Sequence, residues 1–529
     1  MRDPIYTIEY SLSCFTQVLK SYCIYKIELN IDIKNEIIII IMSSFTTPTP
    51  LSFQAFKLLQ KAPEGNSTLP NNYGTINLKA IKQDALTLDK LILGFSLDRS
   101  GSMEIISKDG NSLLQHAQTV VINIARYLMD VNIKNPNTSF AIKIVYFDNQ
   151  LDELPLFKIN FENQTDNIDD FISNFKQYKP RGSTNIQLPI EHFKNNELFE
   201  EENAYHILLT DGKPNCGHTS STDLQDSLPN CNNVFIGFGR DHAVKLLTSL
   251  AKTTDGEYNF VNSAENAGML YGDLLHSILY NVSSDISVIM KGGQLYNYKT
   301  KSWDAELNFK KFSTEHTQTL VFKFPWDSVE PQLFEINYTD YQDNKLTHNF
   351  SSTQDGITYN PTNGECKEET RDKHVEKHMY RVKTMEYLAC MKNYTHGSIL
   401  GLALVNEIES FKEELDKFIK RNNYDDDLFM LNLQKDIQLC LTSSKQYSNP
   451  AIGAFLQSRL STHGRQGGFA VDVDDLINNN VQDAIGSLRG LSAPSAVLQT
   501  TPTTSFRQSS AYTTPSQTVL MRVCSQQTT

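Results

Sequence analysis

The sequence predicts an α/β protein: a doubly wound, mostly parallel sheet, then a small β-sandwich-like unit and a helical bundle. Three observations lead to this prediction. Short apolar runs alternate with helical stretches between residues 91 and 281. Short strand-like runs without helices between them continue to about residue 350. Apolar residues then recur at helical spacing from residue 373 to 443.

In the first part, the run LILGFSL at residues 91–97 is continuously apolar, as expected for a strand that is buried on both faces. Further strands are predicted at residues 139–147, 204–210, 233–239 and 256–261. Helices are predicted at residues 113–129, 168–178, 243–254 and 264–279. Strands that alternate with helices form crossover units, so we expect a mainly parallel sheet with helices on both faces.

The second part, residues 286–350, contains short strands separated by turn residues, which indicates an antiparallel β unit. The run NYGTINLKAI at residues 72–81 is expected to add a strand to it. Farther on, the stretches VNEIESFKEELDKFI and LFMLNLQKDIQLCL each carry an apolar stripe at helical spacing. These stripes predict an antiparallel bundle of two or three helices.

The predicted organisation has six parts. They are a non-native or unstructured leader (1–41), an N-terminal segment that pairs with the β unit (42–84), the α/β domain (85–285), the β unit (286–365), the helical region (366–490) and a tail (491–529). The tail is rich in Ser, Thr, Gln and Pro and poor in aliphatic residues, which predicts disorder.

The charge of the chain argues against nucleic acid as a partner. There are 61 acidic and 48 basic residues among 529, a net charge of −13, whereas phosphate binding requires a basic surface. The eight cysteines form no C-x-x-C pair, which favours a reduced intracellular protein. We recognise neither a signal peptide nor an apolar run of about 20 residues, so we expect a cytoplasmic protein without a membrane span.

Oxygen-bearing side chains gather around the stretch LDRSGSM, directly after the strand at residues 91–97. Two later loops, PRGSTNIQ and LLTDGKPN, are expected at the same carboxyl edge of the sheet, where ligands bind in such folds. Hydroxyl and carboxylate oxygens suit Mg²⁺ or Ca²⁺ better than zinc. The candidate metal ligands are Asp98, Ser100, Ser102, Thr184 and Asp211.

Each of these residues also has a simpler explanation. Asp98 and Ser100 could cap the following helix. Ser102 could be a solvated hydroxyl, and Asp211 with Gly212 could form an ordinary turn. The occurrence of all five on the carboxyl side of the predicted sheet, in strand ends or loops, favours one common site.

Residues 85–285 resemble the von Willebrand factor A domain. The run DRSGSM matches the D-x-S-x-S element of its metal-ion-dependent adhesion site, and GSTNI and TDGKPN carry the later Thr and Asp of that site. The resemblance implies that Ser100, Ser102 and Thr184 contact Mg²⁺, while Asp98 and Asp211 bind it directly or through water. A Glu or Asp of a partner protein would complete the coordination, and Mn²⁺ and Ca²⁺ remain alternatives.

No catalytic set accompanies this site, so we expect a metal-dependent protein-binding module and not an enzyme. One alternative is the precursor of an autoprocessing protein, because the order of domains is similar to that of A-domain proteins with an intermediate region and a Hint domain. The chain ends at Thr529 without the cysteine-led Hint segment. A second alternative is an adaptor of the ubiquitin system, although no zinc-binding Cys/His spacing supports it.

Overall fold

The structure is a computed structural model that describes most of the chain from residue 51 to residue 526. Residues within this range that are not described are 59–70, 84–85, 87, 108, 240–241, 255, 263–265, 326–332, 352–367, 446–451, 475–476 and 478–509. The predicted leader at residues 1–41 therefore lies outside the described residues.

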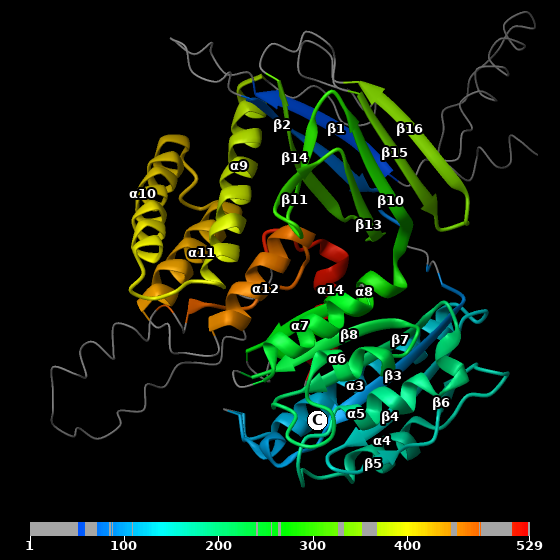
Figure 1. Ribbon diagram of the computed structural model, residues 1–529. Coiled ribbons are helices and arrows are strands. Elements are labelled where there is room, and N and C mark those ends of the chain that lie inside the picture. The colour runs from blue at the N-terminus through cyan, green and yellow to red at the C-terminus, as the bar shows by residue number, and fades with distance from the viewer. Residues whose placement is uncertain are drawn as a thin grey trace, which may run out of the picture. The chain divides into compact units, whose positions relative to one another are not determined.

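A seven-stranded sheet forms the centre of the α/β domain (Figure 1). Its order is β5-β4-β3-β7-β8-β9, and β6 pairs with β4. Five strands run parallel: β3 (Lys90–Asp98), β4 (Ser139–Phe147), β7 (Ala204–Thr210), β8 (Asn232–Phe238) and β9 (Glu257–Val261). Strands β5 (Leu151–Glu153) and β6 (Phe157–Ile159) are antiparallel to β4.

Helices cover both faces of this sheet, which confirms the predicted doubly wound fold. One face packs against α3 (Leu113–Lys134), α4 (Ile168–Lys176) and α8 (Ala267–Leu279). The other packs against α5 (Gln187–Lys194), α6 (Ser221–Leu224) and α7 (Val244–Thr253). Helix α3 begins at a capping box in which the Ser112 hydroxyl accepts a hydrogen bond from the amide of Gln115.

The β unit contains two antiparallel sheets whose inner faces share one apolar core. The first has the order β1-β2-β14-β11-β12: β1 (Leu51–Leu58), β2 (Asn71–Ala80), β14 (Thr317–Pro325), β11 (Gln294–Asn297) and β12 (Ser302–Asp304). The second has the order β13-β10-β15-β16: β13 (Glu306–Ser313), β10 (Asn281–Lys291), β15 (Leu333–Asp340) and β16 (Lys345–Ser351). Strand β2, which precedes the α/β domain in sequence, thus pairs with β14, which follows it.

The described part of the helical region contains four helices, more than the two or three that were predicted: α9 (Glu368–Met391), α10 (Ile399–Asn422), α11 (Leu428–Lys445) and α12 (Ile452–Arg465). A buried charge pair joins two of them. The Asp436 carboxylate of α11 accepts hydrogen bonds of 2.5 and 2.9 Å from the Arg459 guanidinium of α12. His463 contacts the same carboxylate.

The prediction of disorder after residue 491 is wrong for residues 510–526, whereas residues 491–509 lie outside the described residues. Residues 510–526 carry helix α14 (Pro515–Ser525), which begins at a capping box between Thr514 and Gln517. Helix α14 lies against α8 in Figure 1, where Gly268 and Gly272 allow its backbone to approach closely. Its apolar residues Leu520 and Met521 are buried in the core of the α/β domain. Burial of these few apolar side chains accounts for an ordered helix in a segment whose overall composition is polar.

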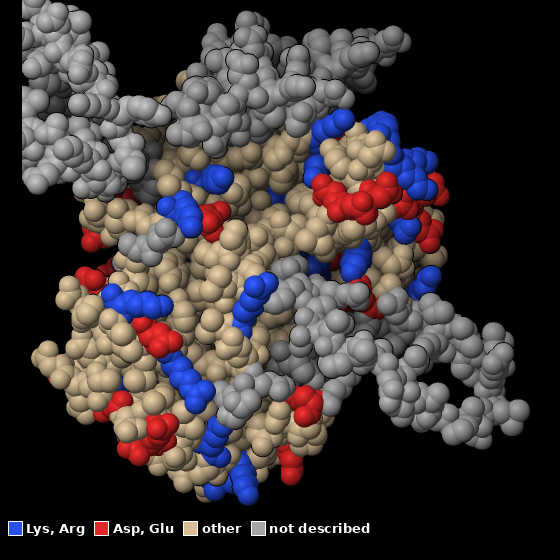
Figure 2. Space-filling view, turned by 180° about the vertical axis from the view of Figure 1, so that it is seen from behind, with Lys and Arg blue, Asp and Glu red and all other residues tan. Residues whose placement is uncertain are grey.

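Figure 2 shows charged side chains of both signs scattered over a surface that consists mostly of other residues. On the face drawn there, the described Lys and Arg residues lie among Asp and Glu residues. Across the described parts of the chain, no helix is both long and apolar enough to cross a membrane.

Candidate metal centre

The candidate site lies where two neighbouring parallel strands end. Strand β3 ends at Asp98, and β7 ends at Thr210, directly before Asp211. The two strands pair in parallel, so both ends reach the same edge of the sheet. After Asp98 the chain enters a short 3-10 helix, Gly101–Glu104, which buried Met103 fixes against the core. Ser100 precedes this helix but forms no side-chain cap, so its hydroxyl does not have the capping role that was the simpler explanation.

Hydroxyl and carboxylate oxygens from both strand ends come together. The Ser100 and Ser102 hydroxyl oxygens lie 3.1 Å apart. The Ser102 hydroxyl donates a hydrogen bond of 2.8 Å to Asp211. Asp98 accepts hydrogen bonds from the Ser100 amide at 2.7 Å and the Thr210 hydroxyl at 2.5 Å. Four of the five predicted ligands therefore form one connected group.

The fifth ligand, Thr184, reaches this group from a separate loop. The loop is tied to the first strand end, because the Gly101 amide donates to the Gly182 carbonyl at 3.2 Å. It is also tied to the loop after β7, where the Asn215 side chain accepts from the Thr184 amide at 3.0 Å. A Cβ built on Gly212 would lie 3.4 Å from the Thr184 hydroxyl and 3.6 Å from that of Ser102, so both hydroxyls flank Gly212.

The spacing of these oxygens fits a small divalent cation. Mg²⁺ binds about six oxygens at roughly 2.0–2.1 Å, which places adjacent ligand oxygens about 3.0 Å apart. The separations of 3.1 Å between Ser100 and Ser102 and 2.8 Å between Ser102 and Asp211 match that value. The residues present are therefore compatible in chemistry and in spacing with an oxygen site for such a cation.

The charge of the site also favours a bound cation. Asp98 is fully buried, and burial raises the pKa of its carboxyl even though hydrogen bonds from Thr210 and Ser100 oppose the shift. Both of those donors are neutral, so a cation beside Asp98 would supply favourable charge. The nearby Asp148 carboxylate also raises the pKa of Asp98. The negative charge of Asp148 itself is compensated by ion pairs with Arg99 at 3.1 Å and Arg181 at 2.8 Å.

Sequence reasoning missed residues that support the five ligands. Thr210 is the last residue of β7 and orients the Asp98 carboxylate. Asp148 directly follows β4, which is the other neighbour of β3. The rule that found Asp98 and Asp211, a polar residue directly after a buried strand, would also have found Asp148. Nothing in the sequence singles out Asn215, because its contact with Thr184 depends on the loop conformation.

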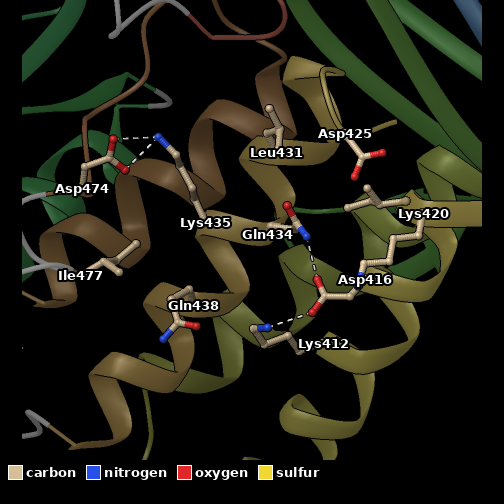
Figure 3. A pocket seen from close by; sticks show the side chains of 11 residues that line it. Lys412, Asp416, Lys420, Asp425, Leu431, Gln434, Lys435, Gln438, Asp474 and Ile477 are labelled. Carbon is tan, nitrogen blue, oxygen red and sulfur yellow. Dashed lines mark hydrogen bonds and ion pairs between the residues drawn. The ribbon is translucent and has the colours of Figure 1, made fainter. Parts of the chain in front are cut away.

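Among the described residues, no three His, Cys, Asp or Glu side chains gather as a metal site. The candidate centre is compatible with this, because three of its five ligands are hydroxyls. A pocket of about 400 Å³ lies elsewhere, between α10 and α11 (Figure 3). Its charged groups largely pair with one another: Lys412 with Asp416 at 2.9 Å and Lys435 with Asp474 at 2.8 Å. This mutual pairing leaves the strand-end site as the stronger candidate.

Comparison with known proteins identifies the fold of the domain that contains this site. A model of the von Willebrand factor type A domain matches residues 93–273, and this part of the chain has that fold. Similar solved structures include the ArnB paralog VWA2 from Sulfolobus acidocaldarius, with 15% identity over 79% of this chain and 97% of that one, and a TM-score of 0.41. Another is a von Willebrand factor type A protein from Catenulispora acidiphila, with 10% identity over 78% and 91% of the two chains, and a TM-score of 0.43. No curated protein matches the sequence.

Proposed function

We propose that this chain is a protein-binding module that holds Mg²⁺ at the edge of its parallel sheet and uses the ion to bind a carboxylate of a partner protein. The observation that carries the proposal is the position of the Ser102 hydroxyl, 3.1 Å from that of Ser100 and 2.8 Å from the Asp211 carboxylate. These separations are compatible with adjacent oxygens around one small cation. Domains of this type are commonly protein-interaction modules.

In this proposal the hydroxyls of Ser100, Ser102 and Thr184 bind the ion, and Asp98 and Asp211 bind it directly or through water. The neutral hydroxyls compensate little of the charge of the ion, so an incoming Asp or Glu carboxylate is attracted to an open position. Mn²⁺ and Ca²⁺ are the alternative ions, because both also prefer oxygen ligands. The chain acts by binding, without a catalytic step.

The test uses two synthetic peptides that differ only in the central residue, Glu in one and Gln in the other. Binding of the whole chain to each immobilised peptide is measured in Mg²⁺ and in EDTA. We expect the wild-type chain to bind the Glu peptide in Mg²⁺ and to lose that binding in EDTA. Asp211→Ala should abolish it, because this substitution removes the carboxylate to which Ser102 donates.

Asp130→Ala serves as the matched control, because Asp130 is an exposed acid near the end of α3. It should bind the Glu peptide as the wild type does. Equal binding of the Glu and Gln peptides, or binding that survives EDTA, would rule out the metal-dependent mechanism. Circular dichroism of Asp211→Ala separates a lost site from a lost fold.

A further inference from the structure

Two adjacent isoleucines lie exposed beside the candidate metal centre. Ile105 and Ile106 expose 59% and 61% of their surfaces. They belong to the loop that carries Ser100 and Ser102, and the Ile105 amide donates a hydrogen bond of 3.1 Å to the Ser102 carbonyl. Single exposed apolar residues are common in proteins, but an adjacent pair three residues from a proposed ligand merits an explanation.

The backbone holds both isoleucines in place. The Leu113 amide donates to the Ile105 carbonyl at 3.1 Å, and Ile106 forms an isolated β-bridge with Ser112. The apolar anchor of this loop is Met103, whose side chain is fully buried. The fold therefore does not need the two isoleucine side chains for packing, and it presents them to solvent on a hydrogen-bonded loop.

The loop that carries Asp211 presents a cation. Lys213 is exposed two residues after Asp211, and within the described part of the chain the structure gives it no ion pair. The surroundings of the proposed ion thus offer an apolar pair on one loop and a positive charge on another. A surface of this kind complements a segment that has both apolar and acidic side chains.

We propose that Ile105 and Ile106 form the apolar part of the partner-binding surface, so that the partner is a protein segment in which a metal-binding Asp or Glu is directly flanked by a large apolar side chain. This inference rests on the proposed function and specifies the class of partner. Burial of the two isoleucines adds a non-directional contribution to affinity, whereas the carboxylate makes the binding metal-dependent. Lys213 further favours a segment with more than one acidic residue.

The test compares two synthetic nonapeptides, each with a central Glu in a Ser/Gly background. In one peptide Leu flanks the Glu on both sides, and in the other Ser does. Affinities of the whole chain for both are measured in Mg²⁺ and in EDTA. We expect the Leu-flanked peptide to bind the wild type about tenfold more tightly in Mg²⁺, which corresponds to about 1.4 kcal/mol.

The double variant Ile105→Ser/Ile106→Ser should lose this preference while still binding the Ser-flanked peptide in Mg²⁺. The matched control is Ile133→Ser near the C-terminal end of α3, where Ile133 is 73% exposed. It should keep the tenfold preference.

The possible failures can be distinguished. If both peptides bind equally in Mg²⁺ and neither binds in EDTA, the proposed function stands and the apolar surface is overturned. If neither peptide shows metal-dependent binding, the proposed function fails and the inference fails with it. If the double variant loses the Ser-flanked peptide as well, the isoleucines maintain the site and do not contact the partner. If the isoleucines mediate self-association instead, sedimentation will show a wild-type dimer that the double variant lacks, and the inference is overturned.

Discussion

The hydroxyl of Ser102 donates a hydrogen bond of 2.8 Å to the carboxylate of Asp211, although 109 residues separate them in sequence. The contact exists because β3 and β7 are parallel neighbours in the sheet, which places the residues after both strands at one edge. The intervening chain forms β4 to β6 and the three α-helices α3, α4 and α5, then returns to the other side of β3. The strand order therefore determines which distant oxygens meet.

Removal of the metal should lower the stability of the wild type but not that of a variant without the site. A ligand that binds only the folded state stabilises it by about 2.7 kcal/mol at a concentration 100 times its Kd. We expect saturating Mg²⁺ to raise the thermal midpoint of the wild type, and Asp98→Ala to abolish that shift. Calorimetric scans in Mg²⁺ and in EDTA measure the shift of the thermal midpoint. The control variant Asp130→Ala should show the same shift as the wild type. An equal shift in the Asp98 variant would place the ion elsewhere.

The candidate site was largely predictable because its residues follow a simple rule. The runs at residues 91–97 and 204–210 are continuously apolar, so their strand character and their polar ends stand out in sequence. Thr184 was also predicted, from the expected place of its loop at the carboxyl edge of the sheet, and the resemblance to a known domain supported it; its loop does not directly follow a buried strand. The position of this loop depends on two hydrogen bonds that periodicity does not reveal: one between Gly101 and Gly182, and one between Thr184 and Asn215.

Helix α14 was not predictable from amino-acid composition, because the composition was taken over a Ser-, Thr-, Gln- and Pro-rich stretch that is longer than the helix. Helix α14 has only a few buried side chains, including Leu520, Met521 and Cys524. Its position depends on tertiary contacts: the Asn123 side chain donates to the carbonyls of Cys524 at 3.1 Å and Gln526 at 2.7 Å. Such contacts have no local signal, because about 400 residues separate the partners.

A methyl group at Gly94 should destabilise the α/β domain. Gly94 lies in β3, where an added Cβ would come within 2.5 Å of the rings of Phe193 and Phe199. We expect Gly94→Ala to lower the free energy of unfolding by about 1–3 kcal/mol, the usual effect of overpacking. Gly453→Ala in α12 is the control, because a Cβ there meets nothing within 4 Å. Urea denaturation measures both, and equal stability of the two variants would contradict the close packing.

Deletion of residues 510–529 should destabilise the folded chain. The deletion removes Leu520 and Met521 from the core, and each buried side chain of this size contributes about 1.5–3 kcal/mol. We therefore expect a loss of about 3 kcal/mol or more, with increased binding of a hydrophobic dye to the uncovered face of α8. Deletion of residues 527–529 alone is the control and should change neither quantity. An unchanged unfolding midpoint after the longer deletion would show that α14 adds nothing to stability.

Acidification should destabilise the α/β domain through His206. Its side chain is fully buried between Ser96 and Asn233, at 2.8 and 3.1 Å, and burial lowers its pKa to about 4. The unfolded chain takes up a proton near pH 6.5, and the folded chain only near pH 4. Between these values the unfolded state binds more protons, so stability falls as the pH falls.

For His206 alone, the expected loss between pH 7 and pH 5 is about 2 kcal/mol. Burial also lowers the pKa of His276 and His316 to about 4, so the wild type should lose more than this amount. His206→Gln removes one titrating group, so the difference in unfolding free energy between the two pH values should shrink by about 2 kcal/mol. Urea titrations at both pH values measure it. As the control, His218→Gln at an exposed position should leave the difference in unfolding free energy between the two pH values as it is in the wild type. If His206→Gln also leaves that difference unchanged, His206 does not resist protonation in the folded state.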